Sequence, residues 1–182
     1  MMRNNIVVRP MTKKYAPERV RILRQPSVIN GVFMEQPVSV EKTELWCDSI
    51  IKSTVRTDFV FLEGEAVVGF SGLVNISHKN GTAEFYIFID NDIQGKGCGR
   101  FITNWLLTFA KDELGLRKIT LFVTAGNEAA LSLYENIGFS LEGTLLKHSW
   151  FRGRYVDRLI LSIFLDDVNN ELNAYEYFHG GV

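Results

Sequence analysis

The sequence predicts an α/β fold of the α+β type, with a mixed, mostly antiparallel sheet of about seven strands and helices on both faces. Runs rich in β-branched and aromatic residues alternate along the chain with amphipathic, helix-like runs. Two connections, Glu63-Gly64-Glu65 and Lys79-Asn80-Gly81, have the composition of β-hairpin turns, so the strands that they join are expected to be antiparallel. No repeat, linker or low-complexity stretch divides residues 1–182, which predicts a single domain.

Residues 5–9 alternate weakly and end at a proline, which is consistent with a strand at a sheet edge. Residues 15–25 carry an apolar stripe at helical spacing after an early proline and predict the first helix. The stretch 26–38 contains two prolines and predicts a loop. A second helix is expected from the N-cap Ser39 to about residue 53. Its expected inward side chains are Leu45, Trp46, Ile50 and Ile51.

The strand-like runs 58–63, 66–76 and 82–89 follow one another across the two hairpin turns. A helix is predicted at 101–111, with Gly115 closing its C-terminal end. The rest of the pattern predicts a strand at 118–124, a helix at 127–137 and a long hairpin of strands at 143–151 and 154–165. The polar tail 166–182 is expected to be a short helix, an oligomer contact or partly disordered.

The bulk composition is that of an ordinary soluble globular chain. With 182 residues, 46% of them hydrophobic and 23% charged, the chain is long enough for one full core. The net charge of -1 gives no reason to expect a nucleic acid or a membrane surface as a partner. No apolar run approaches the roughly 18 residues of a membrane span, and the first residues lack the pattern of a signal peptide.

The cysteines and histidines give no metal-binding pattern. Cys47 and Cys98 lie on different predicted elements without the spacing of metal ligands, so both are expected to be free thiols in a reducing cytoplasm. The three histidines, at 78, 148 and 179, are scattered. We therefore expect a cytoplasmic protein without a structural metal.

A glycine-rich loop joins the predicted strand 82–89 to the helix that follows. Its glycines, Gly95, Gly97 and Gly99, stand at alternate positions and allow positive φ and close approach of another group. A loop of this kind at a helix N-terminus directs several N–H groups to one point, which favours an anion such as a phosphate. Lys96 and Arg100 would add positive charge at the rim. The alternative is a flexible turn that only links strand and helix.

The spacing excludes two common phosphate-binding loops. The P-loop requires a glycine, then four residues of any type, then Gly-Lys-Ser/Thr. The dinucleotide-binding loop requires Gly-x-Gly-x-x-Gly. Neither pattern fits this sequence. The pattern Gln-x-x-Gly-x-Gly does fit, at Gln94, Gly97 and Gly99. A second segment, from Asn127 to Phe139, reads Asn-x-x-Ala-x-x-x-Tyr-x-x-x-Gly-Phe and follows a predicted strand. In both motifs, and in their order, the chain resembles the GNAT superfamily of acetyl-CoA-dependent N-acetyltransferases.

The resemblance implies a cofactor site for acetyl-CoA between two splayed central strands. The loop would hold the pyrophosphate through the residues Gln94, Gly95, Lys96, Gly97, Cys98, Gly99 and Arg100. The opened strand edge would meet the pantetheine amides through the backbone of Ile87, Phe88 and Ile89, and one of these N–H groups would polarise the thioester carbonyl. Asn127 resembles a residue that contacts the cofactor; it can also cap its helix.

Acetyl transfer to an amine makes two proton demands. The amine, with a pKa near 10, must lose a proton before it attacks, and the leaving thiolate departs faster when an acid protonates it. Tyr134 resembles the family's general acid, although it can also be an aromatic packing residue. Glu84 is a candidate for the base or for an ammonium ligand, and it can equally be a solvated strand carboxylate. His148 is expected to be structural or substrate-lining rather than catalytic.

Cys98 stands at a predicted helix N-terminus, which lowers a thiol pKa. Because enzymes of this family transfer the acetyl group directly, we expect no covalent role for it.

The acceptor is suggested by a wider resemblance to the branch with the ribosomal-protein, amino-sugar-nucleotide and spermidine/spermine acetyltransferases. The similarity to the polyamine enzymes covers almost the whole chain and implies carboxylates that hold ammonium groups, here Glu35, Glu41, Glu44 and Glu84. The chain departs from them in having a single acidic residue in the loop 28–38 and a neutral Asn75. A small-molecule amine, such as a polyamine, is therefore the expected partner, in a homo-oligomeric enzyme. The alternatives are a protein or peptide N-acetyltransferase and a non-catalytic acetyl-CoA sensor.

Overall fold

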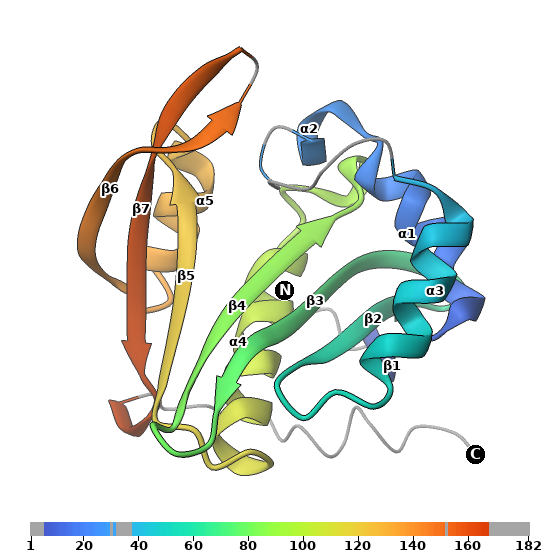
Figure 1. Ribbon diagram of the computed structural model, residues 1–182, viewed down its shortest axis with the longest axis horizontal. Helices are drawn as coiled ribbons and strands as arrows, with labels where there is room; N and C mark the ends of the chain where they lie inside the picture. Colours follow the sequence, from blue (N-terminus) through green and yellow to red (C-terminus); the bar gives the residue numbers. More distant parts are fainter. Residues whose placement is uncertain (1–5, 30, 32–37, 152, 168–182) are drawn as a thin grey trace.

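Seven strands form one continuous sheet in the computed structural model, which describes residues 6–29, 31, 38–151 and 153–167. The strand order across the sheet is β1-β2-β3-β4-β5-β7-β6 (Figure 1). The strands are β1 (Ile6–Pro10), β2 (Thr57–Glu63), β3 (Ala66–Ser77), β4 (Thr82–Ile89), β5 (Lys118–Thr124), β6 (Ser140–Phe151) and β7 (Arg154–Phe164). Only the pair β4–β5 is parallel among the neighbours described. The predicted mixed, mostly antiparallel sheet is confirmed, and β1 is at its edge as expected.

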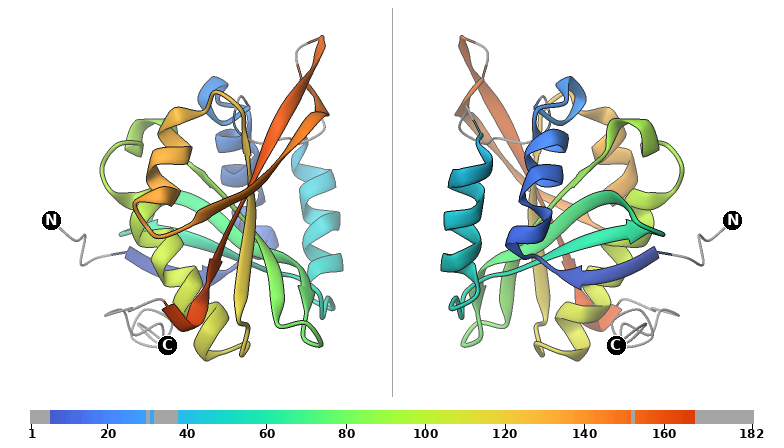
Figure 2. Two further views of the ribbon diagram at one scale, coloured as in Figure 1. Left: turned by 90° about the vertical axis from the view of Figure 1, so that its left-hand side faces the viewer. Right: turned by 90° about the vertical axis from the view of Figure 1, so that its right-hand side faces the viewer.

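Helices cover both faces of the sheet (Figure 2). The α-helices are α1 (Ala16–Leu23), α2 (Pro26–Ile29), α3 (Val40–Ile50), α4 (Cys98–Asp112) and α5 (Glu128–Glu135), and the short 3-10 helices are η1 (Lys13–Tyr15), η2 (Asn91–Ile93) and η3 (Leu165–Asp167). Alternation along the strands divides the buried side chains into two cores. On β2, for example, Phe59 and Phe61 face the core under α4, while Val60 faces the core under α1 and α3.

The second predicted helix is present as α3, but only two of its four predicted inward residues, Trp46 and Ile50, pack against the core. Ser39 caps it as expected, because its side chain accepts a hydrogen bond from the Lys42 N–H at 3.2 Å. The buried positions of α3 are the small residues Thr43 and Cys47, whereas Leu45 is 70% exposed, as is Ile51 after the helix. Trp46 and Ile50 pack at the margin of the core. Small side chains at 43 and 47 allow α3 to lie close to α1, and this contact decides its inward face.

Two other stretches differ from the expected pattern or cannot be compared with it. The predicted loop 26–38 begins with the short helix α2. The helix was not predicted, because the two prolines in this stretch indicated a loop. Residue 30, residues 32–37 with Glu35, residue 152 and residues 168–182 lie outside the described part of the chain. The expectations for the tail therefore stay predictions.

β4 and β5 diverge soon after they pair. Their register contains three partners, Thr82–Lys118, Ala83–Ile119 and Glu84–Thr120, and ends there. The rest of β4 continues to pair with β3 as far as Ile89, while β5 turns away beside β7 (Figure 1). The backbone of β4 beyond Glu84 thus has an open edge toward β5, as the resemblance to the superfamily implied.

Candidate active site

A cavity of about 730 Å³ opens where β4 and β5 separate. Most of its lining residues lie on β4 from Glu84 to Ile89, in the glycine-rich loop, at the end of β5, and on α5 with its N-cap Asn127. A further wall comes from Ser27, Val28 and Gly31, at and after α2. Most of the site residues predicted from the sequence are therefore neighbours in space.

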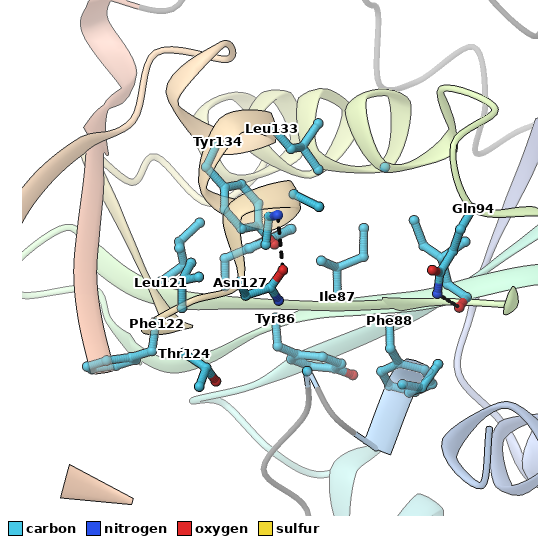
Figure 3. Close-up of a pocket in the computed structure, with 18 of the residues that line it drawn as sticks. Tyr86, Ile87, Phe88, Gln94, Leu121, Phe122, Thr124, Asn127, Leu133 and Tyr134 are labelled. Atoms are coloured by element: carbon cyan, nitrogen blue, oxygen red, sulfur yellow. Dashed lines mark hydrogen bonds between the residues drawn. The ribbon is translucent and has the colours of Figure 1, made fainter. Parts of the chain in front are cut away.

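The cavity reaches both faces of the sheet. Figure 3 shows Tyr134, Leu133 and Asn127 on the α5 side of the splayed strands, and Tyr86, Phe88, Phe122 and Thr124 on the other side. This division follows from strand alternation, because Tyr86 and Phe88 are two residues apart on β4 and Phe122 and Thr124 are two apart on β5. Two reactants can therefore approach the gap between the strands from opposite faces.

The glycines of the loop serve two different purposes. Gly97 is the N-cap of α4 in the left-handed conformation, with φ of 84°, and Gly95 has φ of 77°. A Cβ at either position would meet no described atom within 4 Å, so these two glycines are needed for backbone conformation and leave the cavity side open. At Gly99 the reason is packing, because a Cβ there would lie 3.1 Å from Leu133 Cδ2 and 3.4 Å from Ile89 Cδ1.

The other loop residues divide into those that line the cavity and those that do not. Gln94 lines it, and its side-chain amide donates to the Ile89 carbonyl at 3.2 Å and to Ser27 Oγ at 3.4 Å. Arg100 lines it from the first turn of α4 and donates to the Asn136 carbonyl at 3.5 Å.

Lys96 instead folds back and donates to the Asp92 carbonyl at 2.8 Å. Cys98 is buried in the core under α4. Lys96 and Cys98 do not belong to the described cavity lining.

Tyr134 both packs and lines the cavity. It is 7% exposed, and its ring lies edge-on to Phe85 at 6.1 Å and to Phe139 at 5.6 Å between ring centroids. Burial raises the pKa of its hydroxyl above the ordinary value, so the group carries its proton at neutral pH. Within the described residues the hydroxyl has no recorded hydrogen-bond partner, which leaves the proton available to a bound group.

Asn127 combines the two roles that its sequence motif allowed. Its side-chain oxygen accepts the Ala130 N–H at 3.2 Å, which caps α5, and the residue also lines the cavity. The capping bond fixes the start of α5 and hence the position of Tyr134 further along the helix.

Glu84 is the last residue of β4 that pairs with β5, and the two strands separate after it. It is half-buried, lines the cavity on the face of Tyr86 and Phe88, and accepts a hydrogen bond from Asn75 Nδ2 at 3.0 Å. Glu41 lies exposed in the first turn of α3 and is not part of the described lining. Glu35 lies outside the described residues, and His148 is exposed on β6.

Tyr86 forms a rigid part of the wall on the face of Glu84. Its hydroxyl donates to Asp58, whose two carboxylate oxygens accept Arg56 N–H groups at 2.6 and 2.8 Å. Burial, followed by the nearby charge of Asp58, raises the pKa of the Tyr86 hydroxyl. The ring therefore keeps its place through a buried polar network as well as through packing.

Arg158 and Thr124 are among the cavity residues that the sequence reasoning missed. Arg158 of β7 pairs with Thr124 of β5, so their side chains share the face of Glu84. The Arg158 guanidinium donates to the Phe122 carbonyl at 3.3 Å; burial lowers its pKa, and the charge of Glu84 opposes that shift. The Thr124 hydroxyl oxygen is buried without a recorded partner. Neither residue belongs to a local motif, because the β5–β7 pairing brings them to the cavity.

The described residues give no sign of a metal centre or of a membrane-crossing helix. They contain no group of three or more His, Cys, Asp and Glu side chains placed to hold a metal ion. No helix that the structure describes has the length and apolar character that a membrane span requires.

Comparison with known proteins places the chain in a family. Residues 5–140 match the family model of the acetyltransferase (GNAT) domain. The chain is 29% identical over 163 residues to the spermidine N(1)-acetyltransferase of Escherichia coli K12, covering 88% of this chain and 87% of that protein. It is 33% identical over 131 residues to the spermidine N(1)-acetyltransferase of Vibrio cholerae, covering 71% and 76%.

The fold comparison agrees. The crystal structure of spermidine N-acetyltransferase from Vibrio cholerae in complex with CoA and spermine superposes with a TM-score of 0.86 at 27% identity, covering 91% of this chain and 99% of that one. The family match extends over most of the chain and includes the splayed strands, the glycine-rich loop and α5. The chain belongs to the GNAT acetyltransferase family and is an acetyl-CoA-dependent N-acetyltransferase.

Proposed function

We propose that the acceptor is a primary amine of a small molecule, with a polyamine as the first candidate. The observation that carries the proposal is the cavity that passes between β4 and β5. Tyr134 lines it on one face of the sheet, and Glu84, which lies two residues before Tyr86 on β4, lines it on the other. An amine entering beside Glu84 would meet the acetyl group in the gap. The relatives whose names specify spermidine support an alkyl polyamine as the molecule that carries this amine.

The site residues have the following proposed roles. Gln94, Gly95, Gly97, Gly99 and Arg100 would receive the pyrophosphate, and the open edge of Ile87 to Ile89 would receive the pantetheine amides. Lys96 and Cys98 would contribute only through their backbone. Acetyl-CoA supplies the acyl group as a thioester. Asn127 would border the cofactor while it caps α5.

The proton transfers are assigned to Glu84 and Tyr134. Glu84 would bind the ammonium form of the acceptor and take its proton, directly or through water. The neutral amine forms the new C–N bond, the C–S bond breaks, and the Tyr134 hydroxyl gives its proton to the departing sulfur. The nitrogen releases its second proton to solvent as the amide forms. Tyr134 then recovers a proton from solvent. Glu41 has no place in this scheme because it does not line the described cavity, and Glu35 keeps its sequence-based assignment as an ammonium ligand.

A second acceptor class is favoured by Arg158. The described charged groups that line the cavity on the face of Glu84 are one carboxylate, Glu84, and one guanidinium, Arg158. A polyamine brings several positive charges, which Arg158 would repel, whereas an amine that also carries an anionic group would pair with both residues. An amino acid or an amino-sugar nucleotide has this charge pattern.

The test is release of free thiol from acetyl-CoA with a panel of spermidine, spermine, aminoglycosides, amino-sugar nucleotides, amino acids and short peptides. Fast release with spermidine or spermine supports the polyamine assignment, and fast release with the anionic amines supports the second class. Turnover of peptides alone would refute both. If no acceptor reacts although acetyl-CoA binds, the small-amine proposal fails.

We also propose a cytoplasmic homo-oligomer. Leu146, Trp150 and Tyr155 are 76%, 60% and 62% exposed on the outer strands β6 and β7, which form one margin of the described sheet. Apolar side chains at such a margin are typical of subunit contacts. Sedimentation velocity on the purified chain gives the assembly size, and a monomer at micromolar concentration would refute the oligomer.

A further inference from the structure

Asp90 is a buried carboxylate between β4 and the glycine-rich loop, outside the described cavity lining. Its side chain is 6% exposed. One carboxylate oxygen accepts an N–H of the half-exposed Arg21 from α1 at 2.5 Å. The other accepts the Gln25 side-chain amide and the Asp92 backbone N–H, each at 3.1 Å. One carboxylate therefore joins the end of α1 to the first turn after β4.

Gln25 ties the same two segments a second time. While its amide nitrogen donates to Asp90, its amide oxygen accepts the Asn91 N–H at 2.8 Å. A third link follows further along both segments, where Gln94 donates to Ser27 Oγ at 3.4 Å. Ser27 and Gln94 both line the cavity. The stretch α1–α2 and the stretch from Asp90 to Gln94 are thus joined by side chains at successive points.

The loop itself is anchored to this junction. The Asp90 N–H donates to the Val68 carbonyl at 3.0 Å, and the Asp90 carbonyl accepts the Ile93 N–H at 3.0 Å, which forms η2. The Lys96 ammonium then donates to the Asp92 carbonyl at 2.8 Å. The start of the loop is consequently determined by the turn that Asp90 holds.

The carboxylate is kept ionised in place. Burial alone would raise the pKa of Asp90, but the hydrogen bonds from Arg21, the Asp92 N–H and Gln25 outweigh it and leave the pKa below its ordinary value. A neutral amide in the same position would replace one carboxylate oxygen by an NH2 group. Either Arg21, or Gln25 together with the Asp92 N–H, would then face a donor where an acceptor is needed.

We propose that Asp90 is a positioning residue that couples the cofactor loop to the α1–α2 wall of the cavity, so that ordering either segment orders the other. The coupling follows from the shared hydrogen bonds, because the loop cannot shift without breaking bonds to Gln25, Arg21 or Ser27. By thermodynamic linkage, a ligand that fixes the loop also favours the conformation in which the α1–α2 wall lines the cavity. The inference rests on the proposed role of the glycine-rich loop in cofactor binding.

The test compares Asp90→Asn with Asp92→Asn, a matched control two residues away at an exposed position. Both changes remove one negative charge near the loop, and simple electrostatics predicts that both tighten the binding of an anionic cofactor. The positioning role predicts the opposite for Asp90→Asn: the Kd for CoA and the KM for acetyl-CoA rise about tenfold, as expected for losing a charge-assisted hydrogen bond, while kcat at saturation changes by less than about twofold. Asp92→Asn leaves CoA affinity unchanged or tighter.

Hydrogen exchange then tests the coupling directly. In the wild type, added CoA should slow amide exchange in 91–99 and also in Pro26–Ile29. In Asp90→Asn, saturating CoA should slow exchange in 91–99 alone. A milder variant, Gln25→Met, provides the test if Asp90→Asn folds poorly. It removes the Gln25 hydrogen bonds to Asp90 and Asn91, leaves Asp90 paired with Arg21, and should lose part of the coupling.

The outcomes separate this inference from the proposed loop assignment. Equal CoA affinity in Asp90→Asn and Asp92→Asn, or protection of 91–99 without Pro26–Ile29 in the wild type, overturns the coupling. If a substitution at Gly97 leaves CoA affinity intact, the loop assignment itself is wrong.

Discussion

Tyr134 has a packing role in the structure and a proposed role as the general acid. Its ring packs against Phe85 and Phe139, and the residue also lines the cavity. Tyr134→Phe keeps the ring and removes the proton, so we expect an unchanged Kd for acetyl-CoA and a kcat lowered by about 10²-fold, the lower end for loss of a general acid. Initial rates and calorimetric binding measure the two quantities, and Tyr15→Phe, half-buried outside the cavity, is the control. A kcat unchanged across the pH range contradicts the acid assignment.

Arg158 gives a residue-level test of acceptor charge. If the acceptor is a polyamine, Arg158→Leu removes a repelling charge from the cavity, and kcat/KM for spermidine should rise by roughly 3- to 10-fold. If the acceptor carries an anionic group, the same variant should lower its kcat/KM by about 10-fold or more, because the paired guanidinium is lost. Arg154→Leu, exposed on the same strand and outside the described lining, is the matched control. Equal responses of the two variants would exclude Arg158 from acceptor recognition.

At the scale of single elements, the glycine-rich loop can be tested without confusing backbone strain with loss of function. Gly97 and Gly64 both adopt positive φ, 84° and 63°, and a Cβ at either meets nothing within 4 Å. Gly97→Ala and Gly64→Ala should therefore lose similar stability, about 1 kcal/mol, in urea titrations. Only Gly97→Ala should weaken acetyl-CoA binding, because in the proposed cofactor site its Cβ would stand where a phosphate approaches the backbone. Equal acetyl-CoA affinity in the two variants would place the anion elsewhere.

The strands and most helices were predictable because their signals are local. Alternation, hairpin turns and caps are encoded within a few residues, as at Ser39. The inward face of α3 was not predictable, because several apolar positions compete and the contact with α1 selects the small residues Thr43 and Cys47 over Leu45. Local composition gives the type of an element, whereas its orientation depends on its neighbour.

The same distinction explains the site. The loop 94–100 and the helix carrying Asn127 and Tyr134 were predictable because each motif is continuous in sequence. Arg158 and Thr124 reach the cavity only through strand pairing, and Asp90 meets Arg21 across 69 residues of sequence. No spacing rule within one segment can indicate such contacts, so the parts of the site that depend on sheet order needed the structure.

For the whole molecule, the buried titratable groups predict a stability plateau with two limits. The folded-state pKa of Asp90 lies below its ordinary value, so its contribution is complete above the unfolded-state pKa of about 3.9 and is lost as pH falls through the folded value. The pKa values of Tyr134 and Tyr86 are raised, so the folded state resists their ionisation. As pH rises above about 10, the unfolded chain ionises these hydroxyls first and stability declines.

Urea unfolding between pH 3 and pH 11 tests this plateau with two variants. Asp90→Asn should lose about 1–3 kcal/mol at pH 7, the usual result of removing a buried charged partner, and should show a shallower loss toward low pH than the wild type. Tyr134→Phe should behave like the wild type toward acid but decline less above pH 10, because one buried hydroxyl no longer resists ionisation. Each variant changes one limit and leaves the other unchanged, because Asp90 and Tyr134 lie on different elements with no shared hydrogen bond among the described contacts. Parallel stability curves for all three proteins would show that these groups do not set the limits.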